Sequence, residues 1–118
     1  MAIPHAKSGE AIDIKPLGPR LQTSVTSTLV KSDVLEVLRL VIPAGEAIDS
    51  HQVPGEITVQ CLEGRVTFDA GGVDRDLSAG QMLFLEGGVP HGLRAVEDSS
   101  VLVSILLRRK PSPLPTES

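Results

Sequence analysis

Hydrophobic and polar positions alternate along much of the chain with the two-residue period of a β-strand. The clearest case is residues 65–70, where Val66 and Phe68 fall on one face and polar side chains fall on the other. The Gly71-Gly72 pair that follows is a two-residue hairpin signal. This region therefore predicts an antiparallel hairpin with one apolar face.

The same kind of pattern predicts strands over most of the sequence. Residues 34–42 are apolar at nearly every position, which is typical of a central strand covered on both faces. Further strands are predicted at residues 11–14, 23–31, 56–62, 73–77, 82–85, 93–96 and 101–107. Glycine- and proline-rich turns separate them, and no stretch keeps a helical period. The pattern predicts a single all-β domain, either a sandwich or a barrel.

Composition changes this picture in three respects. The 118 residues include two Phe and no Trp or Tyr, so Val, Leu and Ile must build the core. The formal charge of −4 and the scarcity of aromatic rings argue against a nucleic-acid partner. Cys61 is the one cysteine, which excludes an internal disulfide.

The ends of the chain differ in character from its centre. We expect a flexible N-terminal arm over residues 1–10, a folded domain over 11–108 and a disordered, proline-rich tail over 109–118. The N-terminus lacks the layout of a signal peptide, and no apolar run reaches the length of a membrane span. We therefore expect a soluble, cytoplasmic protein without a membrane partner.

Two segments place a histidine at fixed distances from glycines. Their marker residues are Gly45, His51 and Gly64 in the first segment, and Gly80, Gly88 and His91 in the second. This spacing resembles the two motifs of the cupin family, and residues 61–64 (Cys-Leu-Glu-Gly) resemble the end of its first motif. The resemblance spans about residues 35–107. It implies a small, stand-alone, RmlC-like cupin, whose fold is a double-stranded β-helix (a jelly-roll barrel).

This chain departs from the family pattern at positions where cupins usually carry metal ligands. Cupins usually bind metal through three His and one Glu, and two of these positions match His51 and His91. The other two are Val53 and Ile57, which cannot ligate a metal. The nearest carboxylate, on Glu56, is one place off and would point to the opposite face of the strand. The resemblance thus implies a degenerate metal site, with no cofactor certain and a divalent transition metal (Zn, Fe, Ni, Mn or Cu) left open.

The resemblance also implies a pocket inside the barrel. Its expected lining is His51, Val53, Ile57, Cys61, Phe84 and His91, with Val59 as an alternative to Cys61. Such a mixture of apolar side chains and two imidazoles suits a small organic ligand with one polar end. The alternative is a metal-dependent enzyme of the dioxygenase or isomerase/lyase type, although no residue is assigned as catalytic. A storage role is a third hypothesis, to which the small size is less suited.

Two further expectations concern the strongly apolar strands. Residues 34–42 and 101–107 carry apolar side chains on both faces, while a small barrel has one interior. We therefore expect a homodimer that covers part of the outer surface. Arg39 interrupts an apolar strand, and either a salt bridge on the sheet face or an anion-binding role inside the barrel would explain it.

Overall fold

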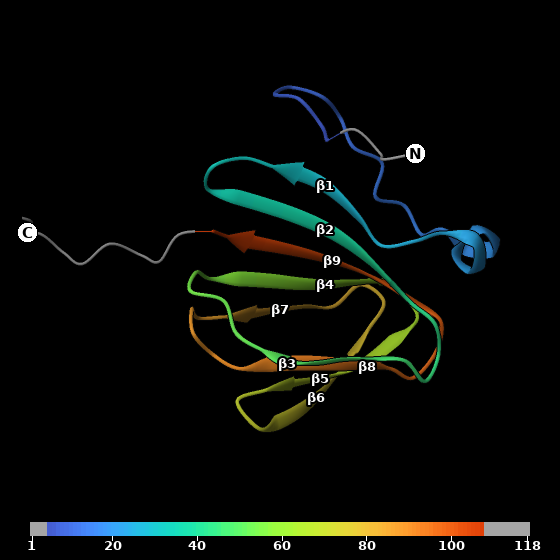
Figure 1. Ribbon diagram of the computed structural model, residues 1–118. Helices are drawn as coiled ribbons and strands as arrows, with labels where there is room; N and C mark the ends of the chain where they lie inside the picture. Colours follow the sequence, from blue (N-terminus) through green and yellow to red (C-terminus); the bar gives the residue numbers. More distant parts are fainter. Residues whose placement is uncertain (1–4, 108–118) are drawn as a thin grey trace, which may run out of the picture.

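The computed structural model describes residues 5–107, which form two antiparallel sheets that face each other (Figure 1). The five-stranded sheet contains, in spatial order, β1 (Ser27–Lys31), β2 (Leu35–Ile42), β9 (Ser99–Leu106), β4 (Ile57–Glu63) and β7 (Met82–Leu85). The four-stranded sheet contains β3 (Ala47–His51), β8 (His91–Ala95), β5 (Arg65–Ala70) and β6 (Val73–Ser78). This architecture confirms the predicted all-β, double-stranded β-helix.

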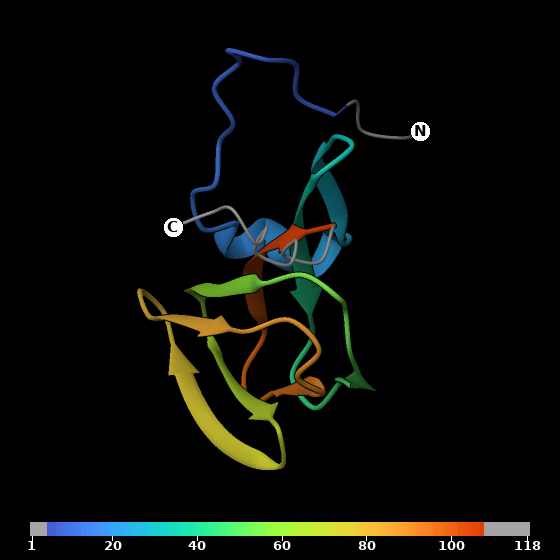
Figure 2. The ribbon, with the colours of Figure 1, turned by 90° about the vertical axis from the view of Figure 1, so that its left-hand side faces the viewer.

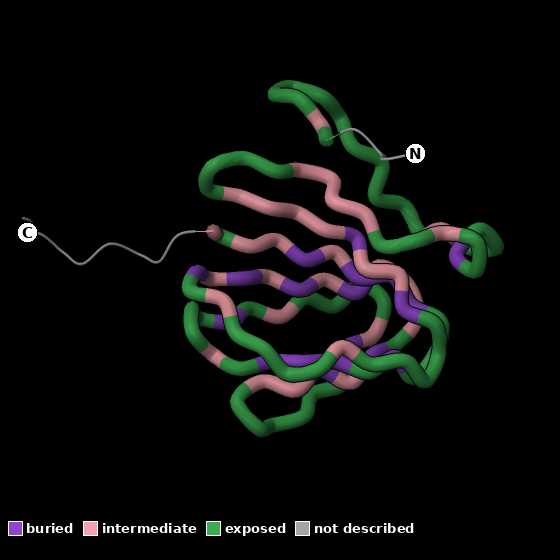
Figure 3. The backbone as a smooth tube through the Cα atoms, in the orientation of Figure 1, coloured by how far each residue is buried: buried purple, intermediate pink, exposed green. Residues whose placement is uncertain are grey.

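Apolar side chains from both sheets meet in a single core. The buried members come from almost every strand, and Val59, Val66, Phe68 and Val101 are the largest of the nearly inaccessible apolar ones. Burial is concentrated on the strands that line the space between the sheets (Figure 3). Viewed from the side of the β5–β6 turn, the strands surround one interior (Figure 2). A core of Val, Leu, Ile and one Phe is what the composition predicted.

The hairpin of β5 and β6 confirms the clearest part of the sequence pattern. Strand β5 has the predicted bounds, its residues Val66 and Phe68 are buried, and Gly71 and Gly72 form the turn. Both glycines have positive φ angles, as a tight hairpin turn of this kind requires. Clean alternation made both the strand and its inward face predictable.

Three details of the predicted strands are wrong. Residues 11–14 pair with no strand of the described chain and run as an irregular segment. The 3₁₀ helix η1 (Gly18–Thr23) takes the start of the strand expected at 23–31, because Pro19 at its beginning favours a helical turn. Strand β3 was not expected, since its sequence Ala-Ile-Asp-Ser-His is mostly polar. It is an edge strand with mostly exposed side chains, which need no apolar alternation.

The two ends of the chain are only partly described. Within the expected arm, the Ala6 N–H donates a hydrogen bond to the Leu29 carbonyl oxygen on β1 at 2.9 Å. Residues 1–4 and the whole expected tail, 109–118, lie outside the described residues. Across residues 5–107, no helix has the length and hydropathy needed to cross a membrane.

The Arg39 side chain forms hydrogen bonds that hold the N-terminal segment on the outside of the five-stranded sheet. Its side chain is buried, and its Nη2 donates to the carbonyl oxygens of Asp13 at 3.2 Å and Lys15 at 3.3 Å. Its neighbours in β2, Leu38 and Leu40, point the other way, into the barrel. Both explanations expected for Arg39 are therefore replaced by a third: it binds backbone carbonyl groups of its own chain.

Glu63, at the end of β4, holds the next part of the same segment. Its carboxylate accepts hydrogen bonds from the backbone N–H groups of Leu17 at 2.8 Å and Gly18 at 3.0 Å, and from the Ser100 hydroxyl. Partial burial raises the pKa of this carboxyl, but the three hydrogen bonds and the positive charge of Arg39 together outweigh that effect and bring the pKa below its ordinary value. Glu63 therefore stabilises the fold in its ionised form.

We expect the Glu63→Gln variant to lose about 1–2 kcal/mol of unfolding free energy at pH 7, since charge-assisted hydrogen bonds are weakened. A lowered pKa contributes stability that is complete above the pKa of an unfolded glutamate and is lost as pH falls through the folded value. The difference from wild type should hold from pH 7 to about 5 and shrink below about 4.

Denaturant titrations at several pH values measure this difference. The exposed Glu86→Gln is the matched control, expected within about 0.5 kcal/mol of wild type. A Glu63→Gln effect that is absent at neutral pH, or that persists unchanged at pH 3, would contradict the assignment.

Candidate functional site

A cavity of about 200 Å³ lies inside the barrel between the two sheets. Strands β2, β3, β4, β5, β8 and β9 and the loop after β3 all contribute to its wall. The lining residues are Leu38, Leu40, Ile48, His51, Val53, Ile57, Val59, Phe68, His91, Gly92, Leu93, Val103 and Ile105. Among these described residues, only the two histidines carry polar side chains.

The two histidines lie opposite each other on neighbouring strands. His51 of β3 and His91 of β8 are register partners, and their ring centroids are 4.4 Å apart with an angle of 56° between the planes. The register of β3 shifts between Ile48 and His51. At Gly92 a Cβ atom would lie 2.7 Å from the Ile48 carbonyl oxygen, so only glycine lets β8 approach β3 this closely. The irregular edge strand and Gly92 together bring the rings into contact.

Each imidazole has one nitrogen fixed by the backbone. The Nδ1 of His51 lies 3.1 Å from the Asp49 carbonyl oxygen, and the Nδ1 of His91 lies 2.9 Å from the Val89 carbonyl oxygen. Because a carbonyl oxygen only accepts, each Nδ1 carries the hydrogen, and Nε2 of a neutral ring is left with a lone pair. The site thus presents two acceptor nitrogens.

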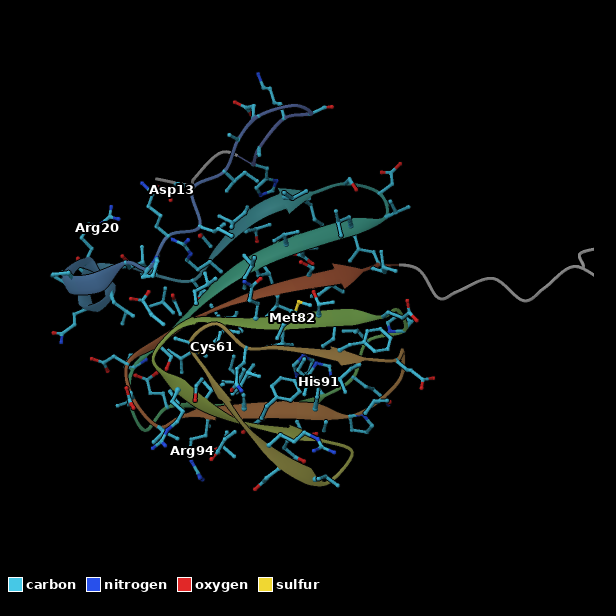
Figure 4. The ribbon with its side chains drawn as sticks, turned by 180° about the vertical axis from the view of Figure 1, so that it is seen from behind. Asp13, Arg20, Cys61, Met82, His91 and Arg94 are labelled. Carbon is cyan, nitrogen blue, oxygen red and sulfur yellow. The ribbon has the colours of Figure 1, made fainter. Side chains whose placement is uncertain are left out.

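The two rings differ in their surroundings. His91 is buried in the interior between the sheets (Figure 4), and its ring stacks on Phe68 with centroids 5.9 Å apart and planes 11° from parallel. His51 is exposed and lies at the edge of the cavity. A molecule that entered the cavity would therefore meet one solvent-facing imidazole and one imidazole held rigidly against the core.

The described residues do not fit a metal site of three or four protein ligands. Val53 and Ile57, at the positions of the missing ligands, line the cavity beside the histidines. Glu56 lies on a groove outside the barrel, as its strand parity predicted. Within residues 5–107, no group of three or more His, Cys, Asp or Glu side chains is close enough to hold a metal ion. Two imidazoles alone fall short of the usual coordination of zinc or a similar ion.

Cys61 does not line the cavity, so its predicted place in the pocket is wrong. The inward direction was correct, since the side chain is fully buried in the core. However, Cys61 lies four residues beyond Ile57 along β4, toward the end of the barrel near η1 (Figure 4). Its Sγ is 3.4 Å from the Glu63 carbonyl oxygen. Val59, the alternative named from the sequence, occupies the cavity wall instead.

Burial raises the pKa of the Cys61 thiol by desolvation, which lowers the amount of reactive thiolate. We expect Cys61 to react with Ellman's reagent at pH 8 on the order of a hundredfold more slowly in the folded protein than in denaturant, because the reagent needs an opening of the barrel. The rate at which the reagent releases its coloured thiolate, measured in the folded and in the denatured protein, gives this ratio. A native thiol that reacted as fast as the unfolded one would contradict its placement.

Phe84 is also outside the cavity, contrary to the prediction. It pairs with Thr58 on the outer face of the five-stranded sheet and is 56% exposed. It borders a shallow groove with Leu35 and Leu106. Strand β7 reads Met-Leu-Phe-Leu, so its alternation is hidden by four apolar residues, and the inward ones prove to be Leu83 and Leu85.

The remaining predicted pocket residues, His51, Val53, Ile57 and His91, do lie together on the cavity. Sequence reasoning missed the part of the wall that comes from β2, β5 and β9. These residues are Leu38, Leu40, Phe68, Val103 and Ile105. The alternation of β5 already placed Phe68 on the apolar face, so it was the one of them that the pattern alone could have supplied.

Comparisons with known proteins agree with this geometry. The family model described as "Cupin domain" matches residues 38–106, more than half of the chain. No curated protein matches the sequence significantly. Among solved structures, an RmlC-like cupin protein from Desulfovibrio desulfuricans is similar at 26% identity and a TM-score of 0.65, covering 86% of this chain and 97% of that one.

Two other solved structures are similar in fold over nearly the whole chain. A conserved protein of unknown function from Streptococcus pyogenes has 23% identity and a TM-score of 0.70, covering 96% of this chain and 97% of that chain. An RmlC-like cupin from Shewanella frigidimarina has 19% identity and a TM-score of 0.68, covering 92% and 95%. At these identities the likeness is one of fold. Together with the family match and the double-stranded β-helix, it establishes that the chain belongs to the cupin family.

Proposed function

We propose that this cupin binds a small, mainly apolar organic molecule in the barrel cavity, with His51 and His91 at the molecule's polar end. The observation that carries the proposal is the wall of the cavity, which is apolar except for these two side chains. Ligand sites commonly combine an apolar wall with a few polar groups that fix orientation. The volume of about 200 Å³ suits a molecule of about the size of benzene, since an apolar protein cavity of about 150 Å³ binds benzene.

The alternative, a metal-dependent enzyme of the dioxygenase or isomerase/lyase type, has less support. Its chemistry would need a metal held by more donors than the site offers, because Val53 and Ile57 replace two ligands. Apolar side chains beside a dication also cannot replace the water molecules that the ion loses on entering the cavity, so its desolvation is costly. The donor set thus favours a binding protein over a metalloenzyme.

Benzene is a suitable first probe, because it tests the apolar cavity without testing the histidines. We expect benzene to shift the methyl resonances of cavity residues such as Val59, Val103 and Ile105, with a Kd of about 1 mM. Val53→Phe should narrow the cavity and weaken this binding at least about tenfold. Methyl NMR titration of the full chain measures both effects.

Val73→Phe is the matched control, because Val73 is 53% exposed on β6 and does not border the cavity. It should leave benzene binding unchanged. The proposal fails if benzene shifts no cavity methyl group, or if Val53→Phe binds benzene as tightly as wild type and the Val73→Phe control do.

Homodimerisation stays a prediction. The outer face of the five-stranded sheet does carry exposed apolar side chains, among them Met82, Phe84 and Leu106. These residues lie on β7 and β9, and Met82 is seen on the outer side of the sheet in Figure 4. Such a face is consistent with the expected cover by a second copy.

A further inference from the structure

We propose that the cavity selects molecules whose polar end is a neutral hydrogen-bond donor, a hydroxyl or an N–H group, over molecules whose polar end only accepts. The proposal rests on the proposed function, because it concerns the same cavity, and it names the chemical class of the ligand.

Each of the two rings carries its hydrogen on the nitrogen that faces the backbone. Backbone carbonyl oxygens of Asp49 and Val89 accept from the two Nδ1 atoms, at 3.1 and 2.9 Å, which fixes the same tautomer in both neutral rings. The free nitrogen is then Nε2 in His51 and in His91, and in this tautomer Nε2 accepts hydrogen bonds and does not donate. Since the centroids are 4.4 Å apart, one small polar group can lie near both rings.

The other described side chains of the cavity wall offer no hydrogen-bond donor. Apart from the histidines, the wall consists of Leu, Ile, Val, Phe and Gly residues. An ether or carbonyl oxygen placed against the rings would meet lone pairs and would lose its hydrogen bonds to water, at a cost of about 1–3 kcal/mol. A hydroxyl or N–H group would instead replace a hydrogen bond to water with one to Nε2.

The described wall contains no Asp, Glu, Lys or Arg side chain. An ammonium group would therefore enter an apolar space without a carboxylate to compensate it, and a carboxylate would enter without a fixed cation. A neutral donor avoids both costs. Phenols, small alcohols and N–H heterocycles on an apolar body of about benzene size match these requirements.

Binding of phenol, anisole, benzene and benzoate separates the contribution of the donor hydrogen from those of the apolar ring and of a negative charge. We expect phenol to bind the full-length protein about tenfold more tightly than anisole, in which a methyl group replaces the donor hydrogen. Benzoate should bind no more tightly than anisole. Long-range proton–nitrogen NMR spectra should show phenol shifting the Nε2 resonances of the histidines more than the Nδ1 resonances.

His91→Phe and His51→Phe keep an aromatic ring at each position, although a slightly larger one, and remove one acceptor each. We expect the preference for phenol over anisole to fall in both variants and to vanish in the double variant, while benzene binding shows that each cavity is intact. Equal binding of phenol and anisole, benzoate binding tighter than phenol, or a preference that survives in the double variant would overturn the inference. If benzene also fails to bind wild type, the proposed function fails; if benzene binds without a preference for phenol, only this inference fails.

Discussion

Gly64→Ala is expected to lower the free energy of unfolding by roughly 2–5 kcal/mol, enough to unfold much of a marginally stable domain. Gly64 joins β4 to β5 with φ at +82°, a conformation that costs a residue with a side chain about 1–2 kcal/mol. A Cβ atom at this position would also overlap the Asp98 carbonyl oxygen and the Ser99 hydroxyl. The backbone must shift to make room, and that overlap adds the second part of the loss.

Gly72→Ala separates the two contributions to this effect. Gly72 has nearly the same φ, +85°, but a Cβ atom there would meet nothing within 4 Å. It should therefore lose only the conformational part, about 1–2 kcal/mol. Thermal or denaturant unfolding of both variants gives the comparison. If Gly64→Ala were no less stable than Gly72→Ala, the close packing of β4–β5 against residues 98–99 would be wrong.

Phe68→Ala is expected to cost about 3–5 kcal/mol, which is typical of removing a buried aromatic ring. Phe68 is 1% exposed, packs in the core and stacks on His91, so its loss leaves a void beside the cavity. The surrounding strands come from both sheets and can collapse only partly into that space. We also expect the Nδ1 and Nε2 resonances of His91 to shift, because the ring loses its stacking partner.

Phe84→Ala is the matched control, since these are the two phenylalanines of the chain. Phe84 is on the outside of the sheet, so its removal should change the unfolding free energy of a monomer by less than about 1 kcal/mol. Chemical denaturation of the two variants side by side measures the contrast. Equal losses would mean that Phe84, and not only Phe68, is buried in the working form of the protein.

The parts of the fold that the sequence predicts are those in which one strand faces water and core alternately. Strand β5 is the best example, since Val66 and Phe68 alternate with polar side chains. In β7 all four residues are apolar, so the pattern did not say which of Leu83 and Phe84 faced inward. Which side chains of β7 face inward is decided by the pairing of β7 with β4, a tertiary contact that the local sequence does not specify.

The anchoring of the N-terminal segment could not be predicted for a different reason. Glu63 looks like an ordinary turn residue in the sequence, but its partners Leu17, Gly18 and Ser100 lie 46, 45 and 37 positions away. Arg39 likewise binds carbonyl groups 26 and 24 residues away. Except for the bond from the Ser100 hydroxyl, these bonds join one side chain to backbone groups. Backbone groups are common to nearly all residues, so no residue type signals such bonds in the sequence.

The candidate site was predictable where the family spacing reached it. His51 and His91 are recognised by their distances from glycines, and the structure brings their rings together. The tautomers were beyond the sequence, because they depend on the backbone carbonyl groups of Asp49 and Val89. The extent of the cavity also depends on β2 and β9, which lie outside both glycine–histidine segments.

Metal content is the measurement that tests most directly whether the two histidines serve an organic ligand and not a metal ion. Tag-free protein purified without chelator, soaked in zinc, iron, nickel, manganese and copper in turn and then desalted, would be compared with His51→Ala and His91→Ala by elemental analysis. We expect far less than one metal per chain, with no difference between wild type and the variants. Near-stoichiometric metal in wild type that is lost in both variants would contradict this expectation.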